Sequence, residues 1–463
     1  MKNGRLLMLS MLLLSAAVSF SGCSGDTTTT GTYSSTSEST SGSTSGATSR
    51  TAFSTSFSSS SVGALISPDA ANNFPAILPG SILDFATPKL NFGVVALESG
   101  GIGIINGKTV TALAPLLTNS LGSYGGGRFD AAITPDGKTT LVSNFGDSTI
   151  YFINTSVPYL PVVRGSVDIG FYAEDIDITP DGRYALVTDG GFTSVIAVID
   201  IQTRTIVETY QDPTNSHQFQ SVAVAKDGTT ILCADYWNSK VHVLTINPNG
   251  HLYYASSLDV SSGGRPVNVV ISPDGLTAIV ANTGGSPVLF PVLSIFEPGK
   301  VSISKWIRPS TNLTGSQSIA FNKSSTQAYV SCVQTDVVED TPDSPKKTTS
   351  YEFKTVILVL DIDTPGHAVQ SGNPIQLDLH GTSQLFGVDT MAVDYETGYL
   401  YFSNPTLSGG LNYLQVVDMQ TRSVIRSISF NPAVVNIGTP EDPIWSEKIQ
   451  IPVGIAFWNP RQS

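Results

Sequence analysis

The chain has little charge and few cysteines. Charged residues make up 13% of its 463 residues, roughly half the usual share in globular proteins, and the formal net charge is −13. Nucleic acid is therefore excluded as a partner, because phosphate binding needs a basic patch, and no Lys/Arg cluster of that kind is present. Besides Cys23, only Cys233 and Cys332 occur, without metal-type or haem-type spacing. They lie in strand-like runs and are expected to be buried thiols.

The common catalytic and metal-binding motifs are also missing. The sequence contains no GxSxG elbow, HExxH pair, P-loop or EF-hand loop. Its five histidines are scattered, with no pair at ligand spacing. We therefore expect no metal and no cofactor, and a non-enzymatic role is favoured over catalysis.

Long hydrophobic runs are absent except near the N-terminus. Leu6–Phe20 is apolar and follows Lys2 and Arg5, but it is too short and wrongly flanked for a membrane span. It ends in Phe20-Ser21-Gly22-Cys23, which resembles the lipobox of bacterial lipoproteins, where the cysteine becomes the lipidated N-terminus. We expect residues 1–22 to be a lipoprotein signal peptide and Cys23 to carry the lipid. An ordinary secretory signal with a chance cysteine is the alternative.

The segment after Cys23 consists almost entirely of Ser, Thr and Gly up to Val62. It has too little apolar surface to offset the entropy of ordering it, so residues 23–62 are predicted to be a flexible tether. The lipid and tether place the protein in the cell envelope, outside the cytoplasm. Ser24 rather than Asp follows the lipidated cysteine, which favours the outer membrane or cell surface over the inner membrane. Residues 63–89 form a lead-in segment.

A Pro-Asp-Gly turn recurs along the rest of the chain. Asp136, Asp181 and Asp274 follow Pro and precede Gly, and Asp227 stands at the same position after Lys226, at intervals of 45 to 47 residues. Pro presets φ, Asp bonds the nearby backbone and Gly accepts a positive φ. Each turn lies between two short apolar runs. It therefore closes a hairpin between the first and second strands of a repeated unit.

The repeated unit has two more strands. Val195–Asp200 and Thr205–Tyr210 are predicted as the third and fourth, joined by the turn Gln202-Thr203-Arg204, and the phrase Gln-Thr-Arg returns at Gln420–Arg422. Four short strands in about 45 residues are the signature of a β-propeller blade. The first strands of seven such units are Ala131–Ile133, Ile176–Ile178, Val222–Val224, Val269–Ile271, Ser318–Phe321, Thr390–Val393 and Pro452–Phe457.

The last of these first strands has no partners after it. Three strands without a first one stand at the other end, at Phe92–Leu97, Gly101–Asn106 and Thr109–Leu113. We therefore predict an all-β, seven-bladed β-propeller over residues 90–463. Its C-terminal strand joins the N-terminal blade and closes the ring, which removes exposed sheet edges.

The phrases TPDGRYALVTD (Thr179–Asp189) and SPDGLTAIVAN (Ser272–Asn282) resemble the YVTN-type repeat of bacterial and archaeal seven-bladed propellers. That group includes YncE-like periplasmic, surface-layer and lactonase-like proteins. The resemblance covers roughly residues 90–463 and implies the fold, whereas the functions within the group differ. It leaves three functions open. They are a binding module, a lactonase-like or other hydrolytic enzyme at the channel mouth, and a structural component of the envelope or surface layer.

Candidate functional residues are expected on one face of the propeller. This top face carries the loops before the first strands and those between the second and third strands. The insertions Thr335–Phe353 and Ala433–Gln450 fall there, and long loops on a rigid scaffold usually bind partners, although neutral drift is the alternative. A protein or surface polymer is the expected partner, besides the membrane. Candidate partner-binding residues are Asp235, Tyr236, Trp237 and Trp445.

A second set of candidates surrounds the mouth of the central channel. Aligning the blades on the Pro-Asp-Gly turn places a polar residue six positions before its Asp. Asp177 is a carboxylate where other blades have Ala, which is costly unless partnered; it binds a ligand, or backbone or channel water satisfies it. The candidate ligand-binding residues are Arg128, Asp130, Glu174, Asp175, Asp177, His217, Gln220, Arg265, Asn268 and Asp389.

Overall fold

The computed structural model describes the chain in segments that begin at Phe92. Cys23, the predicted tether and the lead-in segment lie outside the described residues, so the lipid anchor stays a prediction. All described residues belong to one compact unit, Asp84–Ser463. They are 92–97, 101–106, 109–112, 130–144, 146–191, 193–212, 218–285, 288–310, 313–338, 350–380, 390–403, 413–430, 433–436, 445–448 and 452–459.

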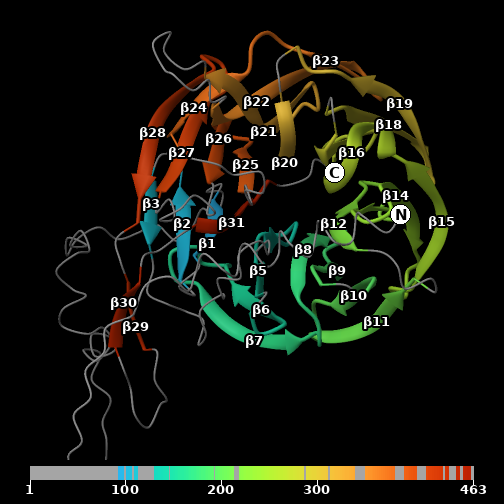
Figure 1. Ribbon diagram of the computed structural model, residues 1–463. Coiled ribbons are helices and arrows are strands. Elements are labelled where there is room, and N and C mark those ends of the chain that lie inside the picture. Colours follow the sequence, from blue (N-terminus) through green and yellow to red (C-terminus); the bar gives the residue numbers. More distant parts are fainter. Residues whose placement is uncertain are drawn as a thin grey trace, which may run out of the picture. The chain divides into compact units, whose positions relative to one another are not determined.

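The described structure is almost entirely antiparallel β-sheet, arranged as the seven blades of a β-propeller (Figure 1). The one helical element in these segments is a 3-10 turn, η2, at Ser261–Gly263. Blade 1 contains β4 (Ala131–Ile133), β5 (Thr139–Asn144), β6 (Thr149–Asn154) and β7 (Val162–Asp168). Blade 2 contains β8 (Ala173–Ile178), β9 (Tyr184–Asp189), β10 (Val195–Asp200) and β11 (Thr205–Gln211). Blade 3 contains β12 (Phe219–Val224), β13 (Thr230–Asp235), β14 (Lys240–Ile246) and β15 (Leu252–Asp259).

Of the next three blades, blades 4 and 5 form one continuous sheet, and blade 6 is again a separate four-stranded sheet. Blade 4 contains β16 (Gly264–Ile271), β17 (Thr277–Gly284), β18 (Phe290–Glu297) and β19 (Lys300–Ile307). Blade 5 contains β20 (Leu313–Phe321), β21 (Gln327–Val338) and β22 (Ser350–Thr364), and β22 pairs with both β23 (His367–Gln370) and β24 (Ile375–His380). Blade 6 contains β25 (Thr390–Asp394), β26 (Tyr399–Ser403), β27 (Tyr413–Asp418) and β28 (Ser423–Ser429). A pairing between β17 and β20 joins blades 4 and 5. The sequence repeat did not predict this pairing.

The two ends of the chain share one blade, as the sequence predicted. Blade 7 has the strand order β3 (Thr109–Ala112), β2 (Ile102–Asn106), β1 (Gly93–Leu97) and β31 (Pro452–Phe457). Gly93 lies opposite Phe457 and Val95 opposite Ile455. In Figure 1 the blue strands near the start of the chain lie beside the red one from its end.

The first strands of the blades line the centre, and the fourth strands lie outside (Figure 1). Each first strand contacts the first strands of its two neighbours, from β4 through β25, and β31 contacts both β25 and β4. The apolar core lies between adjacent blades: Leu141 and Phe152 of blade 1, for example, pack with Ile176 and Val187 of blade 2. Cys233 and Cys332 are buried free thiols, as predicted, and burial raises the pKa of Cys233.

The Pro-Asp-Gly turns have the predicted chemistry. The Asp136 carboxylate accepts hydrogen bonds from the Thr134 hydroxyl at 2.7 Å and the Lys138 backbone N–H at 3.0 Å. Gly137 has φ +72°, and the equivalent glycines also have positive φ. These contacts fix the turn that leads each chain segment from the channel-lining strand to the second strand.

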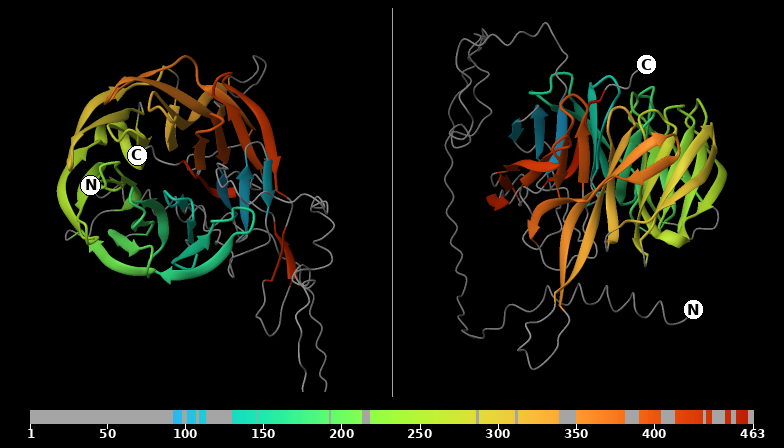
Figure 2. Two further views of the ribbon diagram at one scale, coloured as in Figure 1. Left: turned by 180° about the vertical axis from the view of Figure 1, so that it is seen from behind. Right: turned by 90° about the horizontal axis from the view of Figure 1, so that it is seen from above.

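The long insertion in blade 5 is not a simple loop. Its ends continue β21 and β22, with Thr335 paired to Phe353 and Val338 to Ser350. The predicted loop Thr335–Phe353 is therefore corrected: at least eight of its residues extend a hairpin, which projects past the other strands in Figure 2. The second insertion contains a hairpin of β29 (Ala433–Asn436) and β30 (Trp445–Lys448). The parts between these strands lie outside the described residues.

The repeated Gln-Thr-Arg phrase joins neighbouring blades. Arg204 and Arg422 occupy the left-handed region, with φ +56° and +53°, where three equivalent turns have Gly250, Gly299 and Gly366. Arg204 donates to the backbone carbonyl of Arg164 in blade 1. Arg422 donates to the carbonyl of Ser371 at 2.6 Å and to its hydroxyl at 2.7 Å. These charge-assisted bonds offset the unfavourable backbone conformation.

Candidate functional site

The predicted polar ring lines one cavity at the centre of the propeller. The cavity has a volume of about 290 Å³ and lies among the first strands. Asp130, Asp175, Asp177 and Asn268 line it, as the sequence predicted. The other polar members of the ring, Ser221, Ser318 and Thr390, line it as well.

The carboxylates in this ring connect each first strand to the next. The Asp175 carboxylate accepts the backbone N–H of Val222 at 2.9 Å, and the Asp177 carboxylate accepts that of Val224 at 2.8 Å. Asp177 thus has the backbone partners that its unusual position requires. Two bonds between β8 and β12 lock blade 2 to blade 3, so both aspartates have a structural role whatever else they bind.

Asp130 and Asp175 form an interacting pair of carboxyl groups. Burial raises the pKa of Asp130 well above its usual value, and the charge of Asp175 and the hydrogen bond between the two side chains raise it further. Backbone N–H groups of Ala131 and Ile176 oppose the shift without cancelling it. Asp130 therefore keeps its proton to a higher pH than an ordinary aspartic acid does, in a cavity that also holds the buried Oδ1 of Asn268.

Replacing Asp130 by asparagine should change how stability depends on pH. The folded protein holds the Asp130 proton more tightly than the unfolded chain does, so this stabilisation is complete below the usual pKa and is lost as pH rises toward the raised one. Asparagine at this position imitates the protonated acid. Above pH 4, the free energy of unfolding of the wild type should therefore fall by up to about 1.4 kcal/mol per pH unit relative to that of Asp130→Asn. Urea unfolding at several pH values measures this; parallel curves would contradict it.

A second group of predicted residues meets at the top face between blades 3 and 4. Tyr236 and Trp237 follow β13, and Arg265 lies in β16. The Arg265 guanidinium carbon is 5.1 Å from the ring centroid of Tyr236 and 5.2 Å from that of Trp237. The two rings meet edge to face at 5.3 Å, and the side chain of Trp237 is 38% exposed. We call these three residues the aromatic–arginine cluster.

Asp235 supports this cluster from below. It is fully buried, and its Oδ2 lies 2.9 Å from Asn238 Nδ2 and 3.1 Å from Nε2 of the buried His242. Its Oδ1 accepts the backbone N–H groups of Gln218 at 3.4 Å and Asn238 at 3.3 Å. These bonds fix the loop that begins at Tyr236. A fully buried carboxylate cannot touch a partner, so Asp235 orders the cluster rather than belonging to the contact surface.

The remaining candidates do not join these two groups. Glu174, which is buried, and Gln220, which is half-buried, are not among the residues that line the cavity, and Arg265 lies in the cluster instead. Trp445 begins β30, and only its backbone is described. Arg128, His217 and Asp389 lie outside the described residues. The sequence did not predict the contacts of Arg265 with Tyr236 and Trp237 or that of His242 with Asp235, because these contacts join different strands or blades.

The described residues lack a metal cluster and a membrane-spanning helix. No group of three or more His, Cys, Asp or Glu side chains among them could hold a metal ion. None of the described segments forms a helix long and apolar enough to cross a membrane.

The protein is a β-propeller, and comparisons with known proteins support this class. No family model and no curated protein matches the sequence. Among solved structures, a functionally unknown protein from Desulfotomaculum acetoxidans is similar, with 20% identity, coverage of 80% of this chain and 99% of that one, and a TM-score of 0.57. The periplasmic gluconolactonase of Pseudomonas aeruginosa is similar at 15% identity, 78% and 99% coverage, and a TM-score of 0.54. A Lactobacillus plantarum protein matches at 13% identity, 80% and 99% coverage, and 0.55. Such low identities show the fold alone.

Proposed function

We propose that this protein is an extracytoplasmic binding module, held at a membrane by a lipid on Cys23, whose partner contacts the top face. The aromatic–arginine cluster carries the proposal. Tyr, Trp and Arg are the residues most enriched where binding energy concentrates. The two rings both contact the Arg265 guanidinium and hold it in place, and Asp235 holds the loop. Little conformational entropy is therefore lost when a partner binds.

The top-face location also supports a tethered interaction module. The tether predicted at residues 23–62 would allow the face to meet a protein or polymer of the envelope. One structural neighbour, the gluconolactonase of Pseudomonas aeruginosa, is a periplasmic protein. A protein is the favoured partner, because edge-to-face aromatics with an arginine form anchors that fit protein pockets.

The test is capture of a partner from the native envelope with the full chain as bait. Trp237→Ala and Arg265→Ala should each reduce recovery of the partner by about tenfold or more, as expected for anchors worth at least 1.4 kcal/mol. Tyr253→Ala is the matched control, because Tyr253 is a 55% exposed aromatic on the outer strand β15. A partner that is retained equally by all four baits would contradict the proposal. Recovery of polysaccharide alone would show that the partner is a surface polymer and not a protein.

A second candidate is hydrolysis of a lactone in the central cavity. It is favoured by the position of Asp130 beside Asp175, because burial and the neighbouring charge raise the pKa of Asp130 well above its usual value, and a carboxyl group with a raised pKa can serve as a general acid. A panel of sugar lactones with the wild type and Asp130→Asn tests it. Hydrolysis by the wild type that is lost in the variant would support the enzyme, and inactivity of both would remove it.

A further inference from the structure

A groove opens between blades 1 and 2 on the bottom face, which carries the turns between first and second and between third and fourth strands. Its volume is about 720 Å³, which lies within the usual range for small-molecule sites, about 300–1,000 Å³. The β4–β5 and β8–β9 turns form its inner wall, and β7 and the β10–β11 turn form its outer wall. The groove shares no residue with the central cavity or the aromatic–arginine cluster.

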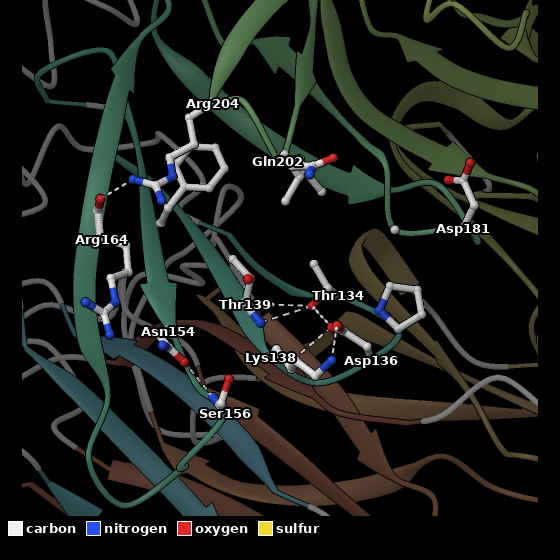
Figure 3. A pocket seen from close by; sticks show the side chains of 14 residues that line it. Thr134, Asp136, Lys138, Thr139, Asn154, Ser156, Arg164, Asp181, Gln202 and Arg204 are labelled. Carbon is white, nitrogen blue, oxygen red and sulfur yellow. Dashed lines mark hydrogen bonds and ion pairs between the residues drawn. The ribbon is translucent and has the colours of Figure 1, made fainter.

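Charges of opposite sign stand at the two walls of the groove. Arg164 and Arg204 belong to the outer wall, and Asp136 and Asp181 belong to the inner wall. Figure 3 shows both arginines on the side opposite Asp181. Lys138 also lies on the inner wall, with Nζ 3.3 Å from Asp136 Oδ2. The charges of Lys138 and Asp136 cancel, so Asp181 gives the inner wall its net negative charge.

Hydrogen bonds hold two of the charged groups, Asp181 and Arg204, in place. Asp181 Oδ1 accepts the Thr179 hydroxyl at 2.6 Å and the Arg183 N–H at 3.0 Å. Arg164 is the extra residue of a β-bulge, because Phe152 pairs with Gly165 and Ile153 with Val163. The Arg164 carbonyl is therefore available, and the Arg204 guanidinium donates to it (Figure 3). A Cβ atom at Gly165 would lie 3.0 Å from Arg204 Nη1. Glycine at this position therefore leaves room for the Arg204 side chain.

Neutral polar groups line the groove together with the charged ones. Thr139, Asn154 and Gln202 line the groove, and their hydroxyl and amide groups can donate and accept hydrogen bonds. Pro135 and Ile201 add a small apolar surface. Acidic and basic side chains on opposite walls, with neutral polar groups in the same groove, match a ligand with an ammonium at one end, amides in the middle and a carboxylate at the other.

We propose that this groove binds a short peptide with both termini free. The ligand carboxylate pairs with Arg164 and Arg204, its ammonium with Asp181, and its amides with Asn154 and Gln202. A ligand with only one charge would pair with one wall alone and would lose the charge-assisted contact at the other. An extended tripeptide spans about 10 Å and carries one charge at each end. The site is independent of the function proposed above.

Calorimetric titration of the full chain with triglycine tests the proposal. N-acetyl-triglycine lacks the ammonium, and triglycine amide lacks the carboxylate. Each should bind about tenfold more weakly than triglycine, because each loses one charge-assisted contact. Arg164→Gln should weaken triglycine about tenfold and leave the amide unchanged. This variant keeps the Arg164 carbonyl that anchors Arg204, so the blades stay joined.

Lys300→Gln is the matched control variant. Lys300 forms an exposed pair with Glu297 on another bottom-face turn, outside the groove, and its loss should leave triglycine binding unchanged. Failure of triglycine to bind would overturn the proposal. Equal binding of all three peptides would also overturn it, as would binding of glucuronate, an acidic sugar with no ammonium, at least as tightly as triglycine.

Discussion

Replacing Asp235 by alanine is expected to lower the free energy of unfolding by about 3 kcal/mol or more. Asp235 is fully buried, and its carboxylate accepts hydrogen bonds from two backbone N–H groups and from Asn238 and lies 3.1 Å from His242 Nε2. Alanine removes every one of these acceptors and leaves the buried residues Gln218 and His242 without the Asp235 carboxylate. Urea unfolding, followed by tryptophan fluorescence, measures the loss.

The same substitution should also disorder the aromatic–arginine cluster. Asp235 fixes the loop that presents Tyr236 and Trp237, so any partner of that cluster should be lost at temperatures where the variant is still folded. Asp235→Asn is the control, because its amide oxygen can still accept the backbone N–H groups. It should cost less than the alanine variant. A stability loss below about 0.5 kcal/mol for Asp235→Ala, the range of ordinary surface substitutions, would show that the buried network does not hold the blade together.

The sequence was sufficient to predict the blades because each local signal agrees with the fold. The Pro-Asp-Gly turns give the register of the first two strands, and the periodicity of about 45 residues gives the count. The second strands of blades 1, 2 and 3 end in Asn144, Asp189 and Asp235. The choice of Asn or Asp at this position also has a physical explanation. Asn144 and Asp189 accept the backbone N–H two residues later, at 2.9 and 2.8 Å. These side chains begin the loop between the second and third strands.

The sites were only partly predictable, because their contacts join residues that the repeat does not relate. The polar ring followed from alignment of the blades, since equivalent positions point to the same axis. Arg265, in contrast, meets Tyr236 and Trp237 across two blades, and the repeat places it near the channel instead. The bottom groove depends on a β-bulge at Arg164. A bulge is one extra residue in a strand, and the alternation of polar and apolar residues did not reveal it.

A chain that ends before Pro452 is expected to lose cooperative folding altogether. β31 supplies all the hydrogen bonds on one side of β1, and its Val453 and Ile455 are buried in two different core clusters. Two buried aliphatic side chains contribute about 3 to 6 kcal/mol, and several strand hydrogen bonds add about 1 kcal/mol each. The total approaches the whole net stability of a typical domain, about 5–15 kcal/mol. Circular dichroism during thermal unfolding should show no sharp transition.

The control for this truncation is a chain that ends at Asn459. It keeps β31, the hydrogen bond from Trp458 Nε1 to the Pro135 carbonyl at 3.0 Å, and that from Asn459 Nδ2 to Val393 at 2.9 Å, and it should unfold like the full chain. A synthetic peptide of residues 452–463 added to the shorter truncation should restore part of the transition, because it can re-form the antiparallel pairing that β31 makes with β1. A truncated chain that unfolds cooperatively at the wild-type temperature would mean that blade 7 does not depend on β31, and that the six remaining blades are stable without it.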